Sequence, residues 1–180
     1  MSKKIIPELT TEYIHSLFEY KNDCLFWKPK KVFNKYHKIW NSRYAFNRAG
    51  TKIKTGYISI GIIINGITYR YLAHRLIFTI NHGYTPNQVD HINGCTSDSR
   101  IENLRDVTNS INGKNCKINS NNTSGLLGVT WDKSRGKWHA QIMVNFKNNN
   151  LGRYIDFFEA CCARKSAERK YGFHINHGRD

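Results

Sequence analysis

The sequence predicts an α+β protein built from two small units, in which short antiparallel strands pack against helices. Three patterns favour this class. Residues 57–72 contain two β-rich runs around Asn65-Gly66, a pair typical of tight hairpin turns because both residues adopt positive φ. Residues 137–146 alternate between apolar and polar side chains, which is typical of a strand with one buried face. Residues 157–171 carry alanines at helical spacing, which lets a helix lie close on that sheet.

Helices are expected on both sides of the first hairpin. Thr10 or Thr11 can cap a short helix that ends near 22–23. Its apolar residues recur at helical spacing: Tyr13, Ile14, Leu17 and Phe18. Residues 73–82 form the second predicted helix, and Gly83 is its stop signal.

A polar, Asn-rich stretch over 112–124 interrupts these patterns and marks a linker. After it, the alternating strand is followed by a short strand centred on 151–155, and an Asp156-x-x-Glu159 capping box begins the last helix. The expected organisation is a first domain with a basic N-terminal arm, a linker, a second domain and a tail, at 1–116, 117–124, 125–172 and 173–180.

Positive charge dominates the chain and is concentrated in one segment. The 28 Lys and Arg residues outnumber the 13 Asp and Glu residues, so the formal net charge is +15. No acidic residue lies between Asp23 and Asp90, whereas eleven cations do, interleaved with aromatic residues. This mixture suits phosphate contacts combined with packing on sugars or bases, so a nucleic acid is the expected partner and Lys35 and Lys38 are candidate contacts. A solvated basic surface is the alternative, although such surfaces usually mix both signs.

Composition argues against membrane-spanning and secreted classes. The longest apolar run, 58–64, is much shorter than the roughly 18 residues that a membrane span needs, so no membrane partner is expected. The N-terminus shows no hydrophobic signal core, which indicates an intracellular protein. The cysteines include no C-x-x-C pair, so free thiols are expected at Cys24, Cys95, Cys116, Cys161 and Cys162.

Acidic residues return in a cluster after the basic segment. Asp90, Asp98, Glu102 and Asp106 fall within 17 positions. Carboxylates repel a polyanionic ligand unless a bound divalent cation offsets their charge. We expect that role for Asp90, and turn or capping roles for the other three.

The segment 89–115 contains the candidate catalytic and metal-binding residues. Asp90 and His91 are adjacent at the end of an apolar segment, Asn103 follows 12 residues later, and Asn112 comes a further nine residues on. The D-H-I-N-G and I-E-N-L-R segments resemble the HNH nuclease motif of phage and intron-associated homing endonucleases. The resemblance implies a ββα-metal nuclease region.

The resemblance also assigns roles. His91 would be the general base that takes a proton from the attacking water, which suits an imidazole at neutral pH. Asp90 and Asn112 would bind one divalent cation at the scissile phosphate, while Asn103 would orient His91 or hold the loop between the strands. Oxygen ligands favour Mg²⁺ (or Mn²⁺) over Zn²⁺. An H-R-L element ahead of the motif makes Arg75 a candidate DNA contact, with helix packing as the alternative.

Residues 124–172 resemble the APETALA2-type DNA-binding domain, which also occurs fused to phage HNH endonucleases. The resemblance rests on Gly128-Val129, Gly136-Lys137-Trp138-x-Ala140-x-Ile142, Leu151-Gly152-x-Tyr154 and the Ala-rich helix. It implies a three-stranded antiparallel sheet that is backed by one helix and that presents its other face to the major groove. A small structural sheet with a basic rim is the alternative.

The resemblance implies a DNA-facing side for this sheet. Gln141 would contact adenine and Arg135 guanine, because their side chains can form paired hydrogen bonds with those bases. His139 shares the DNA-facing side by alternation. Phosphate contacts that position the sheet are expected from Lys133, Lys137 and Arg153.

These features predict a site-preferring endonuclease or nickase for double-stranded DNA, of the homing type, in a phage-infected host cell. A single catalytic constellation cuts one strand, which favours nicking by a monomer over cleavage by a dimer. The alternatives are a non-cleaving DNA-binding regulator and an HNH nuclease that acts on RNA. A structural zinc protein is disfavoured because the chain lacks the paired cysteines of such sites.

Overall fold

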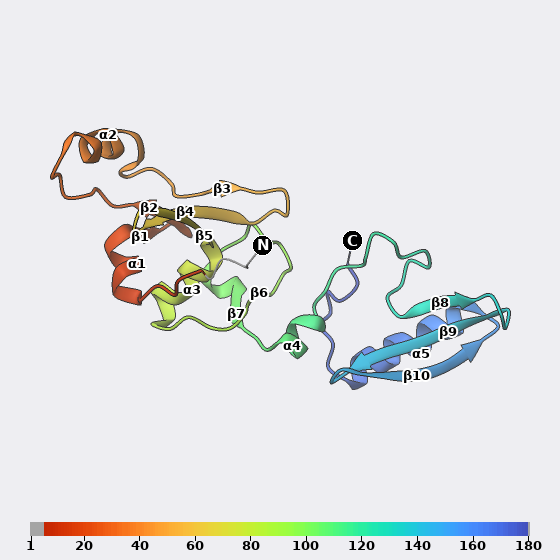
Figure 1. Cartoon of the computed structure of the whole chain (residues 1–180). Coiled ribbons are helices and arrows are strands. Elements are labelled where there is room, and N and C mark those ends of the chain that lie inside the picture. The colour runs from red at the N-terminus through yellow and green to blue at the C-terminus, as the bar shows by residue number, and fades with distance from the viewer. Residues whose placement is uncertain (1–5, 180) are drawn as a thin grey trace. The chain divides into compact units, whose positions relative to one another are not determined.

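The computed structural model describes residues 6–179 and confirms the α+β class (Figure 1). The chain divides into two compact units, Met1–Asp106 and Val107–Asp180. Small antiparallel sheets pack with helices in the described part of the chain. Every helix within residues 6–179 is too short or too polar to cross a membrane.

The first unit is built around helix α3. Its three small sheets have the strand orders β1-β2, β3-β4-β5 and β6-β7. Its elements are α1 (Thr11–Leu17), β1 (Phe18–Lys21), β2 (Cys24–Trp27), α2 (Lys35–Tyr44), β3 (Thr51–Lys52), β4 (Ile58–Ile64), β5 (Ile67–Leu72), α3 (Ala73–His82), β6 (Val89–His91), η1 (Ile101–Asn103) and β7 (Leu104–Asp106).

The hydrophobic core of this unit forms where α3 meets α1 and the strands. Ile77 of α3 is buried with Ile14 of α1, Phe18 of β1 and Ile60 of β4. Burying each such side chain contributes about 1.5–3 kcal/mol. The predicted hairpin at Asn65-Gly66 and the predicted helix over 73–82 are both confirmed. Because α3 also contacts β6 and β7, the core fixes the strands that carry the candidate site.

The first helix is shorter than predicted. It begins after the Thr10 cap but ends at Leu17, and Phe18 starts a strand instead of a further helical turn. Asn22 and Asp23, both with positive φ, form the turn that pairs β1 with β2. The apolar residues that suggested a longer helix are therefore shared between a helix and a strand.

Helix α2 lies on a protruding segment of the first unit, which we call the basic arm, residues 28–54 (Figure 1). The arm is held to β2 by Trp40, whose ring packs edge-on against Trp27 at 5.3 Å between centroids. Asn41 accepts from the Lys30 N–H and donates to the Lys30 carbonyl, both at 2.8 Å. The helix has no buried residue, so these contacts hold it in place of a core.

The second unit contains the predicted three-stranded antiparallel sheet packed on one helix. Its strands are ordered β10-β9-β8, and α5 begins after the Asp156 cap, whose carboxylate accepts from the Glu159 N–H. Ala160 of α5 is buried against Val129 and Ala140, as the small-residue spacing predicted. The elements are α4 (Asn109–Gly113), β8 (Val129–Asp132), β9 (Lys137–Val144), β10 (Lys147–Tyr154) and α5 (Phe157–Lys170).

The central strand of this sheet ends earlier than the alternation predicted. Residues Asn145 and Phe146 have positive φ and form the turn between β9 and β10. Phe146 is consequently 82% exposed instead of facing the helix. The polar residues 147–150, which lack a strand signal, pair with β9 because a two-residue turn brings them back beside it.

Residues 173–179 fold back onto residues 114–118 within the second unit. The His174 N–H donates to the Lys114 carbonyl at 3.0 Å, and the Gly178 N–H donates to the Cys116 carbonyl at 2.9 Å. Buried Arg164 joins this segment to the sheet, since it contacts His177 at 3.1 Å and the Gln141 carbonyl at 2.6 Å. These contacts hold residues 114–118, at the start of the proposed linker, against residues 173–179 of the proposed tail. The predicted domain bounds stay a prediction.

Candidate functional site

The candidate catalytic pair lies on β6, the first strand of a short antiparallel hairpin. Asp90 is opposite Arg105 of β7, and His91 is opposite Leu104. All three residues of β6 are buried, Asp90 at 9% and His91 at 3% exposure. The hairpin and the core beneath it therefore fix both predicted residues on a rigid element.

Arg105 forms an ion pair with Asp90 that the sequence did not reveal. Its Nε and Nη2 donate to the same carboxylate oxygen, Asp90 Oδ2, at 3.0 and 2.7 Å. The contact depends on the strand register, which places the two residues directly across from each other. Asp90 is thus a carboxylate with a cation already beside it.

His91 lies in a cluster of aromatic rings. Its ring centroid is 4.7 Å from that of His74 and 5.8 Å from that of Tyr57. Burial lowers the pKa of His91, although Asp90 and Asp98 act in the opposite direction. Burial lowers the pKa of His74 to about 3, so both imidazoles are neutral at neutral pH. A neutral His91 can accept a proton.

Asn103 holds the loop that follows His91. Its Oδ1 accepts from the Asn93 N–H at 3.0 Å, and its Nδ2 donates to Asn93 Oδ1 at 3.0 Å and to the Asp98 carbonyl at 2.8 Å. Asp98 in turn accepts two hydrogen bonds from the Arg100 guanidinium, which holds the pKa of Asp98 well below its usual range. Of the two roles considered for Asn103, these bonds match the one in which it holds the loop between the strands.

The donor chemistry of the predicted metal ligands suits a hard cation. Asp90 offers a carboxylate in the first unit. Asn112 offers an amide oxygen on α4 of the second unit, a helix whose N-cap is Thr108. Among residues 6–179, no group of three or more His, Cys, Asp or Glu side chains is arranged to hold a metal ion. The pairing of Asp90 with Asn112 as ligands stays a prediction.

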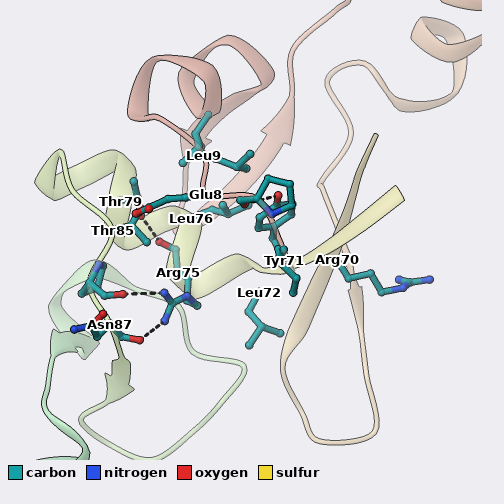
Figure 2. A pocket seen from close by; sticks show the side chains of 14 residues that line it. Glu8, Leu9, Arg70, Tyr71, Leu72, Arg75, Leu76, Thr79, Thr85 and Asn87 are labelled. Carbon is teal, nitrogen blue, oxygen red and sulfur yellow. Dashed lines mark hydrogen bonds between the residues drawn. The ribbon is translucent and has the colours of Figure 1, made fainter. Parts of the chain in front are cut away.

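Arg75 lines a cavity of about 450 Å³ in the first unit, between α3 and the chain segments around Glu8 and Thr85. Figure 2 shows its guanidinium directed at the loop before β6. It donates to the Pro86 carbonyl at 2.8 Å and to the Asn87 carbonyl at 3.0 Å. In this structure Arg75 supports the loop that leads into β6, and its DNA contact stays a prediction.

The predicted contacts of the basic arm are accessible. Lys35 and Lys38 are exposed on α2. Nine of the eleven cations between Asp23 and Asp90 lie in the arm, and the ion pairs found within residues 6–179 involve other residues. Their positive charge is therefore not neutralised by carboxylates of the described chain.

The outer face of the second sheet carries a polar network. Alternation along β9 puts Lys137, His139 and Gln141 on the face away from the buried Ala140 and Ile142. His139 Nε2 lies 3.1 Å from Asn150 Oδ1, and Asn148 Nδ2 donates to Gln141 Oε1 at 2.7 Å. Lys133 is exposed in the preceding turn.

Asp132 is a functional candidate that sequence reasoning missed. Its Oδ2 accepts from Arg135 at 3.2 Å and from Arg153 at 3.0 Å, two residues predicted to contact DNA. The Ser134 hydroxyl and the Arg153 guanidinium hold the pKa of Asp132 well below its usual range, so it is ionised at neutral pH. Arg135 follows Asp132 by three residues in the same turn, whereas Arg153 of β10 is brought beside it only by the register of the sheet.

Comparisons with known proteins agree with the motif. Protein 3.8 of Escherichia phage T7 is 36% identical over 63 residues, which are 35% of this chain and 52% of that protein. The chain thus spans about half the length of the curated relative it matches. No solved structure matches the chain. Residues 71–114 match the family model described as HNH endonuclease, and this range includes Asp90, His91, Asn103 and Asn112. Residues 71–114 therefore carry an HNH endonuclease domain.

Proposed function

We propose that the chain is a metal-dependent endonuclease or nickase for double-stranded DNA, of the homing type. The observation that carries this proposal is the Asp90–His91 pair on β6, within the region that matches HNH endonucleases. A buried, neutral imidazole beside a carboxylate supplies a base and a metal ligand, the two groups that phosphodiester hydrolysis needs.

In this proposal His91 accepts the proton of the attacking water. The neighbouring rings of His74 and Tyr57 pack against the imidazole, and its burial lowers its pKa and keeps it unprotonated at neutral pH. Asn103 restrains the chain that leaves His91, which limits movement of the base during the reaction. Hydrolysis on this pattern gives 5′-phosphate and 3′-hydroxyl ends.

Asp90 and Asn112 would hold the metal ion, which we propose to be Mg²⁺ (or Mn²⁺) because both ligands are oxygens. When bound, the cation supplies positive charge at the scissile phosphate and the leaving oxygen. Arg105 shares the Asp90 carboxylate, so the guanidinium competes with a cation for Oδ2. The charge of Arg105 also favours an approaching phosphate.

Two basic surfaces support DNA as the substrate. Each unit contributes one: the basic arm in the first unit and the outer sheet face in the second. We propose that the arm contacts phosphates and that the sheet face works as an APETALA2-like reading surface. Lys137 and Arg153 would contact phosphates there, while Gln141 and Arg135 would contact bases. A monomer in the cytoplasm of a phage-infected cell fits these roles.

Removing a charge from the arm is expected to weaken binding on every sequence. For Lys35→Ala or Lys38→Ala, the slope of log affinity against log salt concentration should become shallower by about 0.9, because each lysine releases about one counterion. Fluorescence anisotropy on two unrelated duplexes between low and moderate salt measures this. Lys21→Ala, an exposed lysine on β1 outside the arm, is the matched control. An unchanged slope for both arm variants would contradict the assignment of the arm.

Removing the carboxylate at Asp132 is expected to have the opposite effect. In Asp132→Asn, Arg135 and Arg153 lose their anionic partner and can reach phosphates, so duplex affinity should rise about three- to tenfold with a steeper salt dependence. Glu159→Gln, which makes the same charge change on α5, serves as control. If Asp132→Asn weakens binding while Glu159→Gln does not, then Asp132 organises or reads the DNA instead of opposing it.

Cleavage of supercoiled plasmid tests the proposed function. The full chain should convert it to the open circular form in Mg²⁺ or Mn²⁺ and not in EDTA, and end mapping should find 5′-phosphates. Binding without cleavage in any divalent metal would favour a regulator. Preferential cleavage of structured RNA over duplex DNA would favour the RNA-directed alternative.

A further inference from the structure

We infer that the side chain of Phe46 inserts between base pairs of the duplex that the basic arm binds. This inference rests on the proposed function, because it takes double-stranded DNA as the partner. Insertion would unwind the duplex, an effect that neither the proposed general base His91 nor the proposed metal ligands would produce.

The backbone at Phe46 is unusual for its residue type. Residues 44–47 form a type II turn, with Ala45 at φ −57 and ψ 135, Phe46 at φ 63, and the Asn47 N–H donating to the Tyr44 carbonyl at 3.0 Å. The third position of this turn favours Gly or Asn, because a bulky L residue is crowded at positive φ.

The surrounding chain fixes this conformation. The Phe46 N–H donates to the Trp27 carbonyl at 2.8 Å, and Asn47 Nδ2 donates to the Arg43 carbonyl at 2.8 Å. The Trp27 N–H also donates to the Asn47 carbonyl, so both sides of the turn are bonded to β2. The fold thus presents Phe46 from a fixed backbone.

The core does not explain this phenylalanine. Its side chain is 70% exposed, so it contributes little of the burial that stabilises the unit. A glycine would fit the backbone better, and a polar residue would fit the exposure better. A bulky residue kept in a strained and exposed position is accounted for by a contact made in a complex.

The charge around Phe46 selects DNA as the occupant. Arg43 and Arg48 flank it in sequence and are both exposed, and no acidic residue lies between Asp23 and Asp90. Cations on either side can hold phosphates while an apolar ring enters the base stack, which is how apolar wedges kink and unwind duplexes. An acidic protein segment could also bind these cations, but it would give the ring no stack to enter.

Phe146 provides an internal comparison from the second unit. It also has positive φ, 61, and is 82% exposed at the β9–β10 turn. The positions three before and two after it hold Met143 and Asn148 instead of two arginines, and its acid-free segment, 133–155, is shorter and carries five cations. We therefore assign the wedge to Phe46 and use Phe146 as the matched control.

Unwinding of closed circular DNA tests the insertion without knowledge of the target sequence. Relaxed plasmid is saturated with the full chain in EDTA, which suppresses metal-dependent cleavage, treated with topoisomerase I, and deproteinised. The wild type and Phe46→Leu should shift the topoisomer distribution toward negative supercoiling. Phe46→Ala should reduce that shift at least threefold at equal occupancy, and Phe146→Ala should leave it unchanged.

The variant Phe46→Gly separates DNA insertion from a role in folding. It should raise the midpoint of thermal unfolding by about 2–4 °C, because the strained turn is relieved, and it should lose the topoisomer shift. A lower midpoint for Phe46→Gly would mean that the ring stabilises the fold, and would overturn the inference.

The outcomes also distinguish this inference from the proposed function. Binding and nicking with a topoisomer shift that is independent of Phe46 would overturn insertion alone. A shift that depends on Phe146 would do the same. A Phe46-dependent shift without nicking in any metal would overturn the nuclease proposal and leave the insertion standing.

Discussion

Replacing His91 by alanine is expected to lower the rate of plasmid nicking by about 10²–10⁴-fold, the contribution typical of a general base. Affinity for duplex DNA should change by less than about twofold, because His91 is 3% exposed and makes no part of the basic surfaces. Nicking of supercoiled plasmid in Mg²⁺ and gel-shift affinity in EDTA measure the two effects.

Two further variants make this prediction specific. His91→Gln keeps a polar side chain of similar size in the ring cluster, so a loss of nicking in this variant points to the missing base and not to a cavity. His82→Ala removes an exposed imidazole of the same unit that stacks on Phe78, and it should nick at the wild-type rate. If His91→Gln nicks as fast as the wild type, His91 is not the base.

The fold could be predicted where local chemistry decides it. Asn65-Gly66 forms the predicted hairpin turn because the backbone of that turn excludes most other residues, and Asp156 caps α5 as its capping box required. Prediction failed at Phe18 and Phe146, where the apolar pattern extends past the element that it describes. At Phe146 a turn with positive φ at two non-glycine residues ends the strand, whereas at Phe18 the backbone becomes extended and starts β1. Sequence alone gives little signal for either change.

The candidate site shows the same division. Asp90 and His91 are adjacent, so whatever element carries one must carry the other, and the motif spacing names both as candidates. Arg105 was missed because its partner Asp90 lies directly across the β6–β7 pair, and Asp132 was missed because its partner Arg153 lies on β10, on the far side of β9. A one-residue change of register would remove those partners without altering the sequence pattern.

The helix α2 could not be anticipated for a related reason. It has no buried residue, and its cations and aromatics carry no clear helical period. Contacts from Trp27 and Lys30, which lie outside the helix, hold it in place. The charge of this segment was readable from composition, whereas its shape was not.

Replacing Asp90 by asparagine is expected to abolish nicking and to lower Mn²⁺ affinity by about tenfold or more, because the carboxylate is the charged member of the proposed ligand pair. Mn²⁺ binding followed by electron paramagnetic resonance gives an affinity that does not depend on activity. Asp106→Asn is the matched control, since Asp106 ends β7 of the same hairpin and accepts from the Tyr84 hydroxyl.

From the Asp90–Arg105 ion pair we predict the opposite change in Mn²⁺ affinity when Arg105 is replaced. Arg105→Gln removes a cation whose Nη2 is 2.7 Å from Asp90 Oδ2, so Mn²⁺ affinity should rise about three- to tenfold, a modest gain because Arg105 is partly exposed to solvent. Nicking should not rise in proportion, since the guanidinium also attracts the phosphate. If Asp90→Asn weakened Mn²⁺ binding and Arg105→Gln weakened it equally, the arginine would position the carboxylate for the metal and would not compete with it. If neither variant changed Mn²⁺ affinity, Asp90 would not be a metal ligand, and the ion pair with Arg105 would be the reason that this carboxylate is buried.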